Sequence, residues 1–172
     1  ADRVMRKMLE AVNEKIAGEQ DGLRQVVKGT TAFLAFFSEH PKYVELLIQE
    51  RAFFKDRKRP TFDEHREVNG RRWQLLYTRL IAEGRVRPMD VQQISEVIGN
   101  LLYGTMFTNY FAGRHKPVAQ QAHEIIDIVF RGILSDEERA SFLANLPDSD
   151  ASEEREPPRP TSRASSETRP GE

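Results

Sequence analysis

The chain has 172 residues, with 26 Lys and Arg against 27 Asp and Glu, and a formal net charge of −1. This balance lacks the basic excess that is typical of a nucleic-acid-binding domain. The absence of cysteine excludes disulfides, thiol nucleophiles and zinc–thiolate sites. No apolar run approaches the ~18 residues of a membrane span, and no signal peptide is visible. We therefore expect a cytoplasmic protein without a membrane partner.

The first three predicted helices follow from apolar residues at helical spacing. The first runs from Asp2 to Ala17, where Gly18 stops it. Asp21 is suited to cap the second helix, because its carboxylate can accept from the first free backbone N–H groups. Pro41 is suited to the first turn of the third helix, where its missing N–H costs nothing.

Two further helices are longer. Thr61 and Glu64 form a capping-box pattern at the start of a helix that runs to about Ala82. The stretch from Met89 to Gly113 then reads as one helix with apolar side chains on nearly every side. A helix that only covers a core has one apolar stripe and one charged face. This helix must therefore be buried on two sides, against a cavity, a partner subunit, or both.

The last predicted helices run from Pro117 to Leu134 and from Ser135 to about Leu146. Only four residues separate the first of these from residues 89–113, so we expect these two apolar helices to pack antiparallel. Two such hairpins related by a two-fold axis would form a homodimer, whereas a monomer would place both helices centrally. The candidate interface residues are Leu101, Tyr110, Ile125, Ile126, Val129, Phe130 and Ile133.

The domain organisation follows from the same patterns. No stretch longer than four residues alternates with a strand period, so the fold class is all-α, with about seven helices in residues 1–146. Residues 147–172 carry seven acids, four bases and no large apolar residue. We expect this tail to be disordered, because it has too little apolar surface to offset its ordering entropy.

The sequence shows no catalytic constellation. The four histidines form no His-x-x-x-His pair, and neither a phosphate-binding glycine loop nor a nucleophile elbow occurs. The basic residues between Lys55 and Arg59 are typical of a solvated loop that ends at Pro60. We therefore expect no enzyme, no metal site and no cofactor.

A better signal is polar groups placed among aromatic side chains. On the helix that begins at Thr61, residues three and four apart share one face. A pocket for a small apolar or aromatic molecule needs much aromatic wall and a few hydrogen-bonding groups. An ordinary core with locally satisfied polar atoms is the alternative. The candidate lining residues are Phe33, Phe37, Phe62, His65, Asn69, Trp73, Tyr77, Leu102, Thr105 and Asn109.

The order of these parts resembles the C-terminal ligand-binding and dimerisation domain of TetR-family transcriptional regulators. The resemblance covers residues 1–146 and rests on HPKYVELLIQE at 40–50, LIAEGRVRPMD at 80–90 and IGNLLYGTMFTNYFAG at 98–113. In the family, the last of these helices carries a glycine near its middle, here Gly104. The family's N-terminal helix-turn-helix domain has no counterpart in this sequence, so we expect DNA binding only through a domain that is missing here.

The resemblance implies the regulatory half of a small-molecule-responsive repressor, a homodimer that binds a small apolar or aromatic effector. The alternative is an all-α protein-interaction scaffold with no small-molecule site. An enclosed cavity of roughly 300 Å³ or more, bounded by the helices that begin near Thr61 and Met89, would favour the sensor. A solid core would favour the scaffold.

Overall fold

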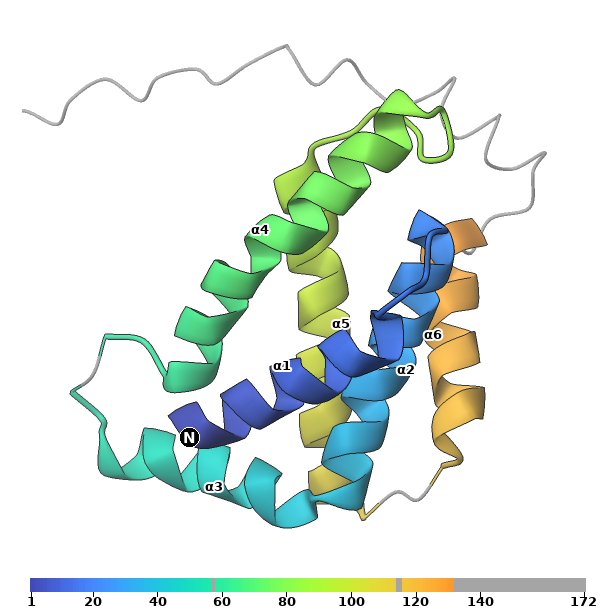
Figure 1. Cartoon of the computed structure of the whole chain (residues 1–172). Coiled ribbons are helices and arrows are strands. Elements are labelled where there is room, and N and C mark those ends of the chain that lie inside the picture. The colour runs from blue at the N-terminus through green and yellow to red at the C-terminus, as the bar shows by residue number, and fades with distance from the viewer. Residues whose placement is uncertain (57, 114–115, 132–172) are drawn as a thin grey trace, which may run out of the picture. The chain divides into compact units, whose positions relative to one another are not determined.

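The computed structural model describes residues 1–56, 58–113 and 116–131. The chain divides after Ile133 into two units, and all of the described residues belong to the first. These residues form six helices and no strand, which confirms the all-α class (Figure 1). The predicted helix from Ser135, the boundary near residue 146 and the tail of residues 147–172 lie outside the described residues.

The first three helices are α1 (Asp2–Ile16), α2 (Gly22–Glu39) and α3 (Pro41–Phe53). The Asp21 side chain accepts a hydrogen bond from the backbone N–H of Arg24 at 2.9 Å, which confirms it as the N-cap of α2. Pro41 occupies the first turn of α3, also as expected. Local capping chemistry therefore sets where these helices begin.

The remaining helices are α4 (Thr61–Ala82), α5 (Val91–Ala112) and α6 (Val118–Arg131). The predicted capping box at the start of α4 is wrong, because Pro60 takes the N-cap position. Thr61 is instead the first helical residue, and its buried hydroxyl donates to the Glu50 carboxylate of α3. Glu50, which belongs to another helix, takes the Thr61 hydroxyl, and a local sequence pattern does not reveal such a tertiary contact.

Two hydrophobic clusters form the core. The larger one packs one side of α1, including Met5 and Met8, against the phenylalanines of α2 and against Tyr103 and Met106 of α5. The smaller one is built from Val26, Leu76, Tyr77, Leu80 and Ile94. Trp73 of α4 packs against both clusters. The two clusters therefore meet at Trp73.

Helix α6 packs mainly against α2, alongside which it lies (Figure 1). The predicted antiparallel packing of the fifth and sixth helices against each other is therefore wrong. The reason is that Val118, Ala122 and Ile125 of α6 insert into the phenylalanine-rich cluster of α2. A pair of amide hydrogen bonds between Asn109 and Gln121, at 2.8 and 3.1 Å, joins the end of α5 to α6.

One side of α5 is buried and the other is open. Ile94, Tyr103 and Met106 are buried, whereas Val97 and Phe111 are 52% and 70% exposed. Burial of α5 on a second side is therefore not achieved within the described part of the chain. None of the described helices is long and apolar enough to cross a membrane.

The predicted interface residues fall into two groups. Leu101 and Phe130 are exposed. Tyr110 and Ile125 pack partly against the larger cluster, Ile126 packs partly against the smaller one, and Val129 is half-buried. Ile133 lies outside the described residues.

Candidate ligand cavity

A cavity of about 620 Å³ lies among α1, α2, α4 and α5. Its volume falls within the range of small-molecule sites. The apolar part of its wall comes from all four helices and consists of Met8, Leu9, Val12, Val26, Phe33, Trp73, Tyr77, Ile98, Leu102 and Tyr103. Several of these residues belong to the two core clusters, so the cavity lies between the two clusters.

Trp73 forms the wall on the α4 side, and its position depends on a glycine. The indole lies over Gly29 of α2 so closely that a Cβ at that position would be 2.6 Å from Cη2 of Trp73. Real Cβ atoms do not approach other atoms so closely, so a side chain at this position would displace the indole. Gly29 therefore fixes how far the indole extends into the cavity.

Three buried residues bring hydroxyl groups to the wall: Thr30, Tyr77 and Tyr103. Burial raises the pKa of both tyrosines far above the ordinary value of 10.0, so both phenols stay protonated. They are available to donate hydrogen bonds to a bound molecule.

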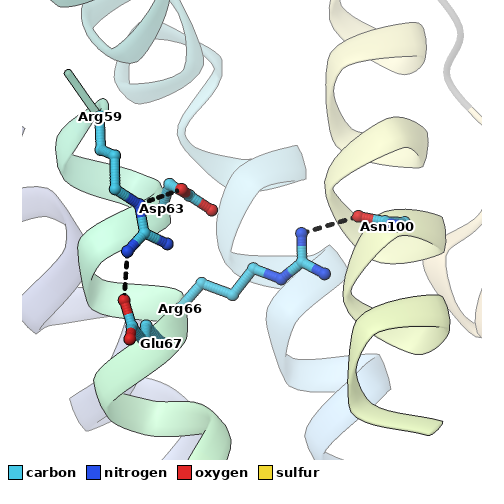
Figure 2. Close-up of polar contacts among 5 residues, drawn as sticks. All are labelled: Arg59, Asp63, Arg66, Glu67 and Asn100. Atoms are coloured by element: carbon cyan, nitrogen blue, oxygen red, sulfur yellow. Dashed lines mark hydrogen bonds and ion pairs between the residues drawn. The ribbon is translucent and has the colours of Figure 1, made fainter. Parts of the chain in front are cut away.

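Charged residues gather on the side of the cavity between α4 and α5. Figure 2 shows Arg59 beside two carboxylates of α4. Its Nε lies 2.8 Å from Asp63, and its Nη1 contacts Glu67. The hydrogen bond with Asp63 is the main reason why the pKa of Arg59 is raised. The basic stretch after α3 is thus not wholly a solvated loop, because Arg59 is held against α4; Arg57 lies outside the described residues.

Arg66 extends from α4 across to α5, as Figure 2 shows. Its Nη1 donates to Oδ1 of Asn100, and its Nη2 donates to the backbone carbonyl of Glu96, both at 2.8 Å. The guanidinium carbon also lies 6.0 Å from the ring centre of Tyr103, within cation–π range. Arg66 therefore spans the gap between the two helices at the cavity.

Half of the predicted lining residues reach this cavity. Those that line it are Phe33, Asn69, Trp73, Tyr77 and Leu102. Phe37 is buried in the core, 5.1 Å from the ring of Phe33, and Phe62 packs against Tyr103 and Phe107. Thr105 and Asn109 lie further along α5, beyond the part that borders the cavity.

His65 contacts α1 instead of the cavity, because its Nε2 forms a hydrogen bond with Oδ1 of Asp2 at 2.8 Å. This bond is the largest cause of the lowered pKa of Asp2. Arg72 of α4 also bonds to the Asn13 side chain of α1. Two polar contacts thus connect the α4 wall of the cavity to the two ends of α1.

Sequence reasoning missed the charged side of the cavity and the two glycines, Gly29 and Gly99. The helical spacing places Arg66 near the face that holds Phe62 and Trp73, but no local sequence pattern indicates that its side chain reaches α5. Met8 and Val12, which have helical spacing, form core as well as wall, and the partly buried Leu9 packs against the same cluster.

Comparison of the chain with protein-family models, with curated proteins and with solved structures finds no match.

Proposed function

We propose that this chain is the effector-binding and dimerisation domain of a TetR-like transcriptional regulator. The observation that carries the proposal is the cavity of about 620 Å³ among α1, α2, α4 and α5. It combines aromatic walls with a few residues that carry hydroxyl groups, the mixture that small-molecule sites use. The order of sequence motifs noted above supports the same assignment.

The alternative, a scaffold without a small-molecule site, would require a solid interior. The cavity is partly open to solvent and not enclosed, and it supports the sensor over the scaffold by its volume and its aromatic wall.

The proposed mechanism is a population shift. A ligand that fits between α4 and the other walls favours the helix arrangement it binds best. The Asp2–His65 and Asn13–Arg72 contacts would transmit a displacement of α4 to α1. In a longer regulator, α1 would connect to the DNA-binding domain, and the dimer would set the spacing of two such domains.

The second part of the proposal is a homodimer formed through the open sides of α5 and α6. Val97, Leu101 and Phe111 of α5 and Ile128 and Phe130 of α6 are all exposed. Large apolar side chains that are exposed on a helix face are typical of a protein interface.

The test of ligand binding is a thermal-shift screen of the full chain against small aromatic and amphipathic compounds. A ligand at 100 times its Kd stabilises the native state by about 2.7 kcal/mol. For a chain of this size we expect a rise in Tm of about 5–10 °C. Leu102→Trp is the matched variant, because it fills the cavity from the α5 wall. A screen without hits, or hits that stabilise both proteins equally, would contradict the proposal.

A further inference from the structure

The charges along the cavity are not all compensated. Arg59, Arg66, Asp63, Glu67 and Glu96 line the side between α4 and α5. Arg59 holds both Asp63 and Glu67 (Figure 2). The carboxylate of Glu96 accepts a hydrogen bond from Nε2 of Gln92 at 2.8 Å. Each of these three acids therefore has a partner elsewhere.

Two lining cations, Arg66 and Arg71, form no ion pair within the described part of the chain, and of the two only Arg66 is half-buried. Both of its acceptors, the Asn100 amide oxygen and the Glu96 carbonyl, are neutral. It forms no ion pair within the described part of the chain. Because the residue is half-buried, water only partly replaces the missing counter-ion. A guanidinium has five N–H donors in a planar fork, and two of them are used here.

The position of this guanidinium is set by packing against α5. A Cβ at Gly99 would lie 2.6 Å from Nε and 2.9 Å from Cζ of Arg66. The missing side chain at position 99 thus leaves room for the guanidinium to lie flat against the helix. Because its two hydrogen bonds to α5 orient the guanidinium, it loses little freedom when it binds a planar carboxylate.

We propose that the cavity binds an amphipathic organic anion whose carboxylate pairs with Arg66. The inference rests on the proposed function and deepens it by naming the ligand class. The body of the ligand would lie against Phe33, Trp73 and Leu102, which form the apolar wall. Arg–carboxylate pairs are frequently bidentate and about twice as strong as neutral hydrogen bonds, so the charge sets the ligand preference.

The experiment compares two probes that differ in charge and hardly in shape: 1-naphthylacetate and 1-naphthylacetamide. Isothermal calorimetry on the full chain gives Kd for each probe. We expect the acid to bind at least about tenfold more tightly than the amide, the ratio that one charged hydrogen bond supplies. Arg66→Gln should remove this preference, and Gly99→Ala should reduce it by displacing the guanidinium.

Arg79→Gln is the matched control, because Arg79 is an exposed arginine of the same helix that does not line this cavity. It removes the same charge and should leave most of the preference for the acid. Circular dichroism and the Tm of each variant show whether its fold is intact.

Three outcomes overturn the inference. If the amide binds as tightly as the acid, the cavity binds ligands but not by charge, and only the ligand class is wrong. If Arg79→Gln and Arg66→Gln reduce the preference equally, the effect is long-range charge and not a carboxylate site. If neither probe binds, the assignment of this ligand class fails, and the broader compound screen decides the proposed function separately.

Discussion

Gly29 and Gly70 are both helical glycines, yet their surroundings differ. A methyl group at position 29 would collide with Trp73, whereas nothing lies within 4 Å of a Cβ at position 70. Replacing a helical glycine with alanine in open space stabilises a protein by about 0.5–1 kcal/mol. We expect Gly70→Ala to show this gain in urea unfolding. Gly29→Ala should not show this gain in stability, because the added methyl group displaces the indole of Trp73.

The emission of Trp73, the only tryptophan, reports that movement. Gly29→Ala should shift its emission maximum, and Gly70→Ala should leave it in place. Equal spectra for the two variants would mean that the indole does not rest on Gly29.

The burial of Tyr77 and Tyr103 leads us to expect that the free energy of unfolding falls at alkaline pH. Burial raises the pKa of both phenols in the folded state, while in the unfolded chain they titrate near 10.0. Above that pH the unfolded chain releases protons that the folded chain keeps, so the free energy of unfolding falls as pH rises. Below it, their contribution is fully present.

We therefore expect Tm to fall as pH is raised above about 10 and to fall less in a Tyr77→Phe/Tyr103→Phe variant. Tyrosinate absorbance during a pH titration of the folded protein provides the second measurement. If both phenols ionise at the ordinary pH without unfolding, they are not buried as described.

At the scale of helices, the open side of α5 makes the sharpest prediction. Leu101 and Phe111 share this side with exposed Gly104 and Thr108, at spacings of three and four residues. We expect the unmodified chain to be a dimer at micromolar concentration. Leu101→Glu/Phe111→Glu should give a folded monomer, since two charges would be buried without partners at the interface. Light scattering measures the mass.

Val68→Glu/Leu75→Glu is the control for this experiment. Both residues are more than 70% exposed on α4, so charge is added to an equally accessible face that is not part of the proposed interface. The control should remain a dimer. An unmodified chain that is monomeric would refute the interface outright.

The helices themselves could be predicted from the sequence, because their signals are local. Asp21 and Pro41 mark where α2 and α3 begin, and a left-handed glycine, Gly113, marks where α5 ends. Tertiary partners could not be predicted in this way. The contacts of Thr61 with Glu50, and of α6 with α2, join residues that are far apart in the chain.

The cavity was only partly predictable for the same reason. Asn69, Trp73 and Tyr77 lie on one face of a single helix, which periodicity reveals. Whether facing helices close the space between them depends on which side chains meet there, and that is a property of the packed structure. Arg66 and Gly99 become part of one site only when α4 and α5 are brought together.

At the scale of the whole chain, the residues from Pro147 to Glu172 should contribute little to stability. They contain no large apolar side chain to bury. Deleting them should change Tm by less than about 2 °C, which is below the shift that 1 kcal/mol produces at this size. Differential scanning calorimetry of the full and shortened chains makes the comparison. A large drop in Tm would show that this segment stabilises the protein.

The central claim is that a small molecule binds in the cavity beside Trp73. The most direct measurement is the emission of Trp73 during titration with a compound whose binding calorimetry has established. The account predicts a saturable change in emission with the calorimetric Kd, and loss of that binding in Leu102→Trp as seen by calorimetry. A compound that binds tightly while Trp73 emission stays constant, and that binds Leu102→Trp equally well, would place the site elsewhere and contradict the account.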